Sequence, residues 1–138
     1  MKKSKQASWA AVISAIVAAL FTVLFGSNDS AVVTDEDWSR SQDNAWVVFE
    51  GTVYKLLPDD NKGSRHQRFL VRSQGGQSLL IAHNIDLADY APVSEGSEVL
   101  IRGQFEWTEK GGVVHWTHHD PQGRREGGYI TVNGQTIR

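Results

Sequence analysis

The sequence of 138 residues contains no cysteine, only one methionine and only three prolines. Without cysteine, the chain cannot form a disulfide framework, a zinc ribbon, an iron–sulfur cluster, a cysteine nucleophile or a lipid-modified cysteine. A large excess of one charge is also missing, because 14 basic and 16 acidic residues give a formal net charge of −2. This balance argues against generic nucleic-acid binding. The length allows one ordinary domain.

Several catalytic signatures are absent as well. No stretch matches the GxSxG nucleophile elbow, a phosphate-binding loop, a dinucleotide fingerprint, the HExxH metalloprotease motif or a zinc finger. These enzyme classes therefore have no support in the sequence.

One long uncharged run is present, from Ala7 to Gly26, and three lysines precede it within residues 1–6. Twenty helical residues span about 30 Å, the thickness of a hydrocarbon core. We expect residues 1–6 to be a cytoplasmic flank and residues 7–26 a transmembrane helix that anchors the chain in a bacterial inner membrane. Because acidic residues follow the run, the C-terminal part is expected in the periplasm. The alternative is secretion after cleavage of a signal peptide, but the run exceeds the usual apolar segment of roughly 7–15 residues.

The remainder divides into a linker and a domain. Residues 27–44 are polar and acidic and are predicted to be a linker, in which Trp38 is the one large apolar residue and is expected to dock on the domain. Residues 45–138 are predicted to form the globular domain. The apolar fraction of 40% and the 13 glycines suit a turn-rich β domain.

The domain is predicted to be all-β. Alternation and turn residues predict strands over 46–57, 67–73, 78–82, 98–107 and 113–118. A short helix is predicted over residues 84–90 with Asn84 as its cap, and Asn133-Gly134 predicts an extra C-terminal hairpin. This order is similar to that of the OB-fold, a small five-stranded barrel. A small open β-roll or an SH3-like barrel is the alternative.

A histidine cluster is the most unusual feature. His115, His118 and His119 lie within five residues and Asp120 follows them. Imidazole titrates near neutral pH and binds transition metals, so these four residues are the candidate catalytic group of a His-dependent hydrolase, for example a metal-assisted phosphodiesterase. A divalent transition metal would be the cofactor, with His83, His115 and His119 as candidate ligands. In an extended strand His115 and His119 would lie roughly 13 Å apart, so one shared ion requires a bend.

Two other interpretations of the cluster remain open. The histidines could bond to backbone carbonyls and stack on tryptophans with no chemical role. His118-His119-Asp120-Pro121 with the glycine pair 127–128 also resembles the opening of the His–Asn–His nuclease motif. The chain departs from that motif because no final histidine follows Asn133.

Basic side chains indicate a binding face. Arg68 and Arg72 share one face of the predicted strand 67–73. In OB-folds that face binds oligonucleotides or oligosaccharides, and arginine can hold phosphate or carboxylate with two hydrogen bonds. The predicted ligand is a polar or anionic small molecule or oligomer. The predicted ligand-binding residues are Arg68, Arg72, His83, Asn84, Arg124 and Arg125. A solvated strand face is the alternative.

The strings His83-Asn84-Ile85-Asp86-Leu87-Ala88 and His115-Trp116-Thr117-His118-His119-Asp120-Pro121 resemble a family of short bacterial proteins, domain of unknown function family 3465. The resemblance covers roughly residues 48–129. It implies a small exported or membrane-tethered β protein and supplies no catalytic roles.

Three functional hypotheses follow. The first is a membrane-anchored periplasmic binding module. The second is the His-dependent hydrolase, which needs its histidines to converge in a pocket. The third is a structural tether in a membrane complex, which predicts an exposed apolar patch.

Overall fold

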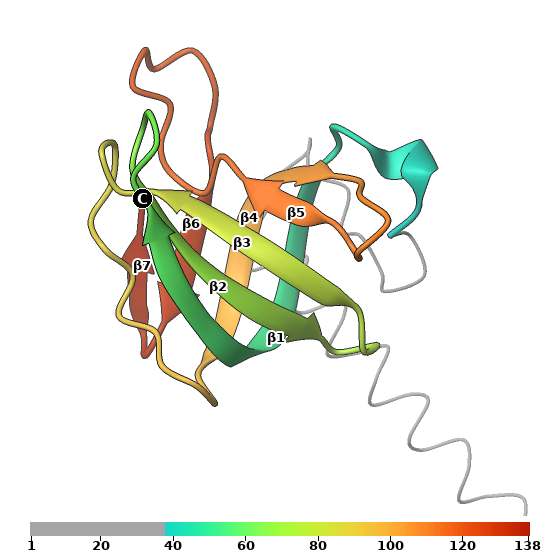
Figure 1. Cartoon of the computed structure of the whole chain (residues 1–138). Coiled ribbons are helices and arrows are strands. Elements are labelled where there is room, and N and C mark those ends of the chain that lie inside the picture. Colours follow the sequence, from blue (N-terminus) through green and yellow to red (C-terminus); the bar gives the residue numbers. More distant parts are fainter. Residues whose placement is uncertain (1–37) are drawn as a thin grey trace, which may run out of the picture. The chain divides into compact units, whose positions relative to one another are not determined.

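The computed structural model describes residues 38–138, and nearly all of its regular structure is β-strand (Figure 1). The all-β prediction is confirmed. In chain order the elements are the 3-10 helix η2 (Arg40–Gln42), β1 (Trp46–Asp60), β2 (His66–Ser73), β3 (Ser78–Asn84), β4 (Glu98–Glu106), β5 (Val113–His115), β6 (Tyr129–Val132) and β7 (Gln135–Ile137).

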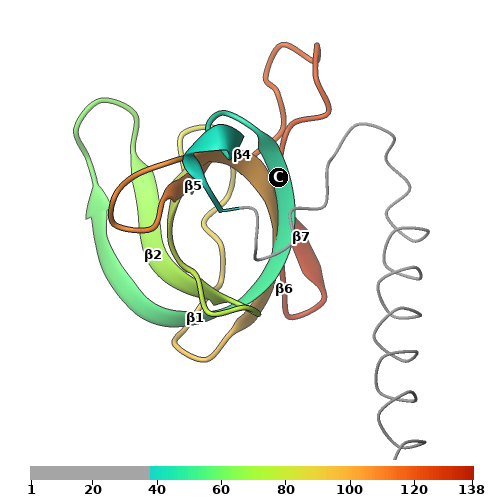
Figure 2. The ribbon, with the colours of Figure 1, turned by 90° about the vertical axis from the view of Figure 1, so that its right-hand side faces the viewer.

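Five of the strands pair in a closed ring. β1 is antiparallel to β2, and β2 is antiparallel to β3. β3 runs parallel to β5, and β5 is antiparallel to β4. β4 then pairs back onto β1, which closes the ring, as the view in Figure 2 shows. The topology leaves two faces, an inner one that encloses the core and an outer one.

The expected C-terminal hairpin is present. β6 pairs with β4 and with β7, so the hairpin extends the sheet from β4. Asn133 and Gly134 connect its strands with φ angles of 54° and 72°. A two-residue turn of this hand requires positive φ at both positions, and asparagine followed by glycine tolerates that best.

The core fills the inside of the ring. Along β2 the buried residues alternate with half-buried or exposed ones, and Phe69 and Val71 point inward with no exposed surface. Trp38 is buried in the same core, its ring centroid 5.1 Å from that of Phe49 and 5.2 Å from that of Phe105. The tryptophan expected to dock on the domain is therefore part of its core.

β1 is longer than expected, because it continues through Pro58 to Asp60. Beyond Val53 the strand pairs with β2 alone, after a register shift between Val53 and Lys55. Proline lacks a backbone N–H and is tolerated where a strand has no second neighbour.

The helix predicted over residues 84–90 is wrong. Asn84 ends β3 and residues 85–87 form a turn, because the local polar groups bond outside a helical pattern. The Asn84 side-chain oxygen accepts the N–H of Asp86, so it closes a two-residue turn instead of capping a helix. The Ile85 N–H donates to the Arg65 carbonyl, and the Asp86 carboxylate accepts the Arg65 N–H at 2.8 Å. Hydrogen bonds with Arg65 replace the bonds that a helix would make.

β5 is shorter than predicted. It ends at His115, and residues 116–118 leave the strand. The cause is Trp116, whose φ of 56° is left-handed and cannot continue a strand.

Residues 1–37 lie outside the described part of the chain, and with them the predicted flank, the predicted transmembrane anchor and most of the predicted linker. Within residues 38–138, no helix is both long enough and apolar enough to cross a membrane.

Candidate functional site

The outer face of β2 and its neighbours carries the predicted basic residues. Arg68, Leu70 and Arg72 alternate with the buried Phe69 and Val71, so they point outward. Their cross-strand partners share this face. One row across the strands runs Lys55, Leu70, Leu80, Val113 and Glu106, and a second runs Leu57, Arg68 and Ala82. We name these outward side chains, with Arg72, the basic face.

Within residues 38–138, no ion pair joins a cation of the basic face to an acidic residue. Among the described residues, the ion pairs join Arg65 with Asp86, Arg102 with Glu126 and His115 with Glu106. None of them involves Lys55, Arg68 or Arg72.

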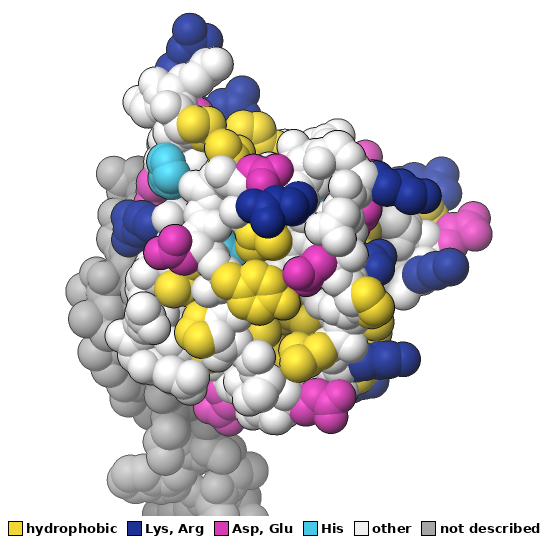
Figure 3. Space-filling model, turned by 60° about the vertical axis from the view of Figure 1, so that its left-hand side comes forward, with side chains coloured by type: hydrophobic (Ala, Val, Ile, Leu, Met, Phe, Trp, Pro, Cys, Tyr) yellow, Lys and Arg dark blue, Asp and Glu magenta, His cyan; other side chains and the backbone are white. Residues whose placement is uncertain are grey.

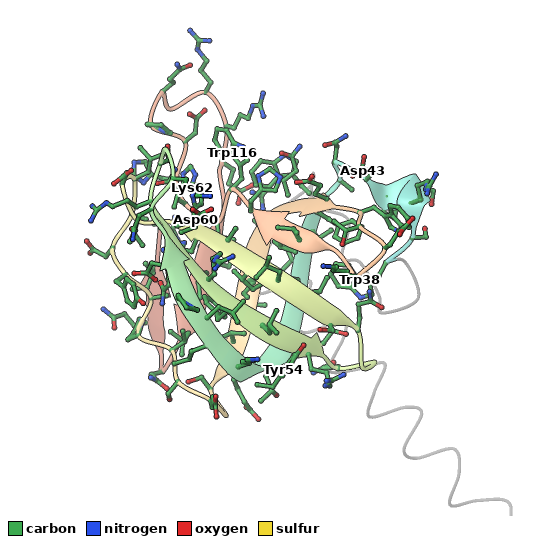
Figure 4. All side chains as sticks on the ribbon, viewed as in Figure 1. Trp38, Asp43, Tyr54, Asp60, Lys62 and Trp116 are labelled. Carbon is green, nitrogen blue, oxygen red and sulfur yellow. The ribbon has the colours of Figure 1, made fainter. Side chains whose placement is uncertain are left out.

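The two arginines of the face are oriented by neutral neighbours. Arg68 Nε donates to the Pro58 carbonyl at 3.0 Å. The Arg72 guanidinium lies 4.7 Å from the ring centroid of Tyr54, which Figure 4 labels. Positive charges that are oriented but not neutralised suit an anionic ligand.

His115 extends this face on β5. The parallel register of β3 and β5 pairs Ile81 with Val114, which puts His115 beside Ala82. Its Nε2 lies 3.8 Å from the Glu106 carboxylate. Burial nevertheless lowers the pKa of His115, and Glu106 opposes that shift only in part.

Beyond β5 the chain forms an aromatic corner. Trp116 has a left-handed backbone, which is strained for a bulky side chain. Its ring stacks on the His118 ring with centroids 5.0 Å apart and meets the Trp46 ring edge-on at 6.5 Å. Figure 4 labels Trp116 in the upper part of the view, where Lys62 and Asp60 are also labelled. We name Trp46, Trp116 and His118 the Trp116 corner.

Arg102 fixes this corner from β4. The residue is 6% exposed, and its guanidinium lies 4.6 Å from the ring centroid of Trp46. Nη1 donates to the Gly127 carbonyl, and Nη2 lies 3.6 Å from Glu126. The buried cation therefore holds the returning segment 126–128 against the corner.

His118 has one bonded and one open ring nitrogen. Its Nδ1 donates to the His119 carbonyl at 2.7 Å, so Nδ1 carries a proton. No described residue bonds Nε2, and the described residues contain no fully buried side-chain nitrogen or oxygen that lacks a partner. Nε2 must therefore reach the surface, although the whole residue is only 3% exposed.

The chain matches one protein family over most of its length. A family model described as a protein of unknown function, DUF3465, matches residues 15–138. The chain belongs to the DUF3465 family. No curated protein and no solved structure matches it. In this DUF3465 chain, the string His115–Pro121 builds the Trp116 corner and the loop after it.

His83, a predicted ligand, is instead a buried connector. Its Nε2 donates to the Asp89 carbonyl at 2.8 Å, and its Nδ1 lies 2.8 Å from the Thr117 hydroxyl. Burial lowers the pKa of His83 below the usual 6.5, so the neutral ring accepts from Thr117 through Nδ1. His83 thereby ties the turn after β3 to the Trp116 corner. Both of its nitrogens are bonded within the DUF3465 domain, which leaves none for an external ligand.

Asp120, a predicted catalytic residue, organises its own loop. One carboxylate oxygen accepts the N–H of Gln122, and the other accepts those of Arg124 and Arg125 at 3.1 Å. These bonds lower the pKa of Asp120, led by the Gln122 N–H. Arg124 and Arg125 are exposed on this loop, and His119 beside it is exposed as well. The loop projects from the ring in Figure 1.

His66 is not among the predicted site residues. It begins β2, pairs with Asn84, and bonds through Nδ1 to the Ser64 carbonyl at 2.8 Å. A charge on His66 would lower the pKa values of His83 and His115, so the three rings lie within electrostatic range. The alternation of the strand, which puts His66 on the same face as Arg68, was the signal that could have found it.

The structure separates the predicted metal ligands by environment, with His83 buried and bonded, His115 half-buried and His119 exposed. Among residues 38–138 no group of three or more His, Asp or Glu side chains is placed to hold a metal ion. The metal site stays a prediction, and the metal content of the purified chain tests it.

Three large hydrophobic side chains of residues 38–138 are exposed. In the described part they are Leu56, Leu87 and Tyr90, and the Tyr90 hydroxyl donates to Asp59 at 3.2 Å. Figure 3 shows a face of the molecule where hydrophobic side chains gather among charges of both signs. This mixture contrasts with the single sign of the unpaired charges on the basic face.

Proposed function

We propose that the DUF3465 domain is an OB-fold-like barrel that serves as a binding module for a polar or anionic ligand. The pairing cycle β1-β2-β3-β5-β4-β1, with its single parallel pair, supports the barrel. OB-folds bind oligomeric ligands on the outer face of the second and third strands. In this chain that face is the basic face.

The observation that carries the proposal is the placement of charge. Residues 45–138 contain 10 basic and 11 acidic residues, a net charge of −1. Within that nearly neutral domain, Lys55, Arg68 and Arg72 lie on one outer face without an ion-pair partner among the described residues. Half-exposed Leu70 lies among them, and half-exposed Leu80 and Val113 continue its row onto β3 and β5. Such a surface attracts an anion while it offers apolar contact area to the rest of the ligand.

The proposal includes a location. The uncharged run 7–26 anchors the chain in a bacterial inner membrane, and the domain stands in the periplasm. Secretion after cleavage of a signal peptide that contains residues 7–26 is the competing outcome.

A matched pair of double variants tests the binding function. The probe is a capped hexapeptide of glutamate, titrated calorimetrically into the full chain in neutral detergent. Arg68→Gln with Arg72→Gln should weaken binding by about tenfold, because two charge-assisted contacts are removed. Lys110→Gln with Arg138→Gln removes the same charge elsewhere and should change the affinity by less than about twofold. Equal losses in both double variants would reduce the effect to net charge and reject the basic face as the site.

A further inference from the structure

We propose that the Trp116 corner is a saccharide subsite, so that the ligand of the basic face is an acidic oligosaccharide. This inference rests on the proposed function and adds the class of ligand. It draws on features of the corner that the charges do not explain.

The first feature is the strain at Trp116. Of the non-glycine residues with positive φ in the described part, two are Asn44 and Asn133, which tolerate this conformation, and the third is Trp116. A tryptophan in this region costs free energy that a strand residue would avoid. The conformation turns the indole onto His118 and Trp46, and Trp116 is partly exposed.

The second feature is the backbone packing behind the indole. A Cβ atom at Gly128 would lie 2.1 Å from the Trp116 carbonyl oxygen and 2.4 Å from that of Arg102. The Gly128 N–H also donates to the His118 carbonyl at 2.7 Å. Gly128 therefore packs directly against the backbone of the strained residue. No other residue can replace this glycine unless the backbone moves.

The third feature is the open nitrogen of His118. Because Nδ1 donates to the His119 carbonyl, the uncharged form of the ring has its acceptor at Nε2, which reaches the surface. A hydroxyl group is a donor that fits this acceptor. An indole face beside a hydroxyl acceptor matches a sugar ring, which has an apolar C–H face and hydroxyl edges.

The subsite continues the basic face. His115 lies beside Ala82 of that face and directly precedes Trp116 in the chain. An extended ligand that crosses the strands would contact the basic face and then the corner. Carboxylates on its sugar rings would meet Arg68 and Arg72, and one ring would stack on Trp116.

The test compares two anionic hexamers on the full chain in neutral detergent. Hexagalacturonate carries carboxylates on sugar rings, and the capped glutamate hexapeptide carries the same number of side-chain carboxylates without rings. Trp116→Gly removes the indole and relieves the strained φ. It should weaken the binding of hexagalacturonate by about tenfold, the effect expected when one stacked ring is lost. His118→Asn removes the open nitrogen and should weaken it by roughly three- to tenfold.

Controls separate this inference from the proposed function. Neither variant should change the affinity for the glutamate hexamer by more than about twofold, because that probe has no ring to stack. Asn133→Gly makes a similar backbone relaxation in the β6–β7 turn and should leave both affinities unchanged. Circular dichroism verifies that each variant is folded, and His118→Asn decides the matter if Trp116→Gly does not fold.

Each outcome has one meaning. If the two hexamers bind equally and neither variant discriminates between them, the subsite is rejected while the binding function stands. If a thymidine hexanucleotide binds more tightly than hexagalacturonate and depends on Trp116, the saccharide class is wrong. If no anionic probe binds, both proposals are overturned.

Discussion

Trp116 is the residue on which the local architecture depends. Its left-handed backbone ends β5, exposes the indole, and turns the chain so that His118 stacks beneath it. Gly128 lies against the backbone carbonyl groups of Trp116 and Arg102. Its missing side chain allows their close approach. The string from His115 to Pro121 and the glycines after it are therefore explained first by structure.

Gly128→Ala should destabilise the domain strongly. Its Cβ would collide with backbone atoms that cannot rotate away, so we expect the free energy of unfolding to fall by about 3 kcal/mol. The control is Gly123→Ala in the same loop, where nothing lies within 4 Å of the added atom but φ is +66°. That change should cost about 1 kcal/mol. Denaturant unfolding compares the two, and equal losses would contradict the collision at Gly128.

His83 should make the stability of the domain depend on pH. Its folded pKa is lowered from 6.5 by burial, so above pH 6.5 the ring is neutral in both states. As the pH falls below that value, the unfolded chain takes up the proton first, and the folded state loses stability until the folded pKa is reached. His115 shifts in the same direction. The carboxyl groups with lowered pKa, Asp86 and Asp120, act in a separate window below 3.8.

His83→Gln isolates this effect, because glutamine can donate to the Asp89 carbonyl and accept from Thr117 but does not titrate. We expect unfolding free energies measured between about pH 7 and pH 5 to fall less steeply in the variant than in the original chain. An unchanged slope would assign the pH dependence to His115 or to another group.

Among the strands, the sequence predicted what alternation controls. The period of two along β2 placed Arg68 and Arg72 outward, and Asn133-Gly134 identified the last hairpin. It did not predict the end of β5, because Trp116 takes its conformation from contacts with His118, Trp46 and the distant Gly128. It also failed over residues 84–90, where Arg65, in the loop before β2, takes hydrogen bonds that the predicted helix would have needed. Local pattern does not contain such long-range partners.

The same limit applies to the predicted site. Histidines close in sequence were expected to act together, but the bend at Trp116 and the pairing of β3 with β5 distribute them to different environments. His83 and His118 are buried, while His119 is exposed. Sequence spacing found the residues and could not assign their surroundings.

The loop after β5 offers a prediction about order. Asp120→Ala removes the acceptors for three backbone N–H groups, those of Gln122, Arg124 and Arg125. We expect hydrogen exchange at these amides to accelerate, because the loop loses its internal anchor. Exchange at Ile101 and Phe105 in β4 should stay as it was. Unchanged exchange in the loop would mean that Asp120 does not organise it.

For the whole protein, the predicted anchor and the domain make a testable combination. If residues 7–26 remain attached, the protein should stay in the membrane fraction during extraction at alkaline pH. Its intact mass should then equal that of the 138-residue sequence. A chain that lacks residues 1–26 should be recovered in the soluble fraction. A shorter mature mass together with release from the membrane would establish signal-peptide cleavage instead.

The distribution of charge over the whole domain leads to the central claim, that the basic face binds an anionic ligand. The most direct measurement is an NMR titration of the isotopically labelled full chain with hexagalacturonate, which reports every amide at once. We expect the largest shift changes at Leu70, Leu80 and Val113, which lie in one row across β2, β3 and β5. Changes concentrated in β6 and β7, or no changes at all, would contradict the claim.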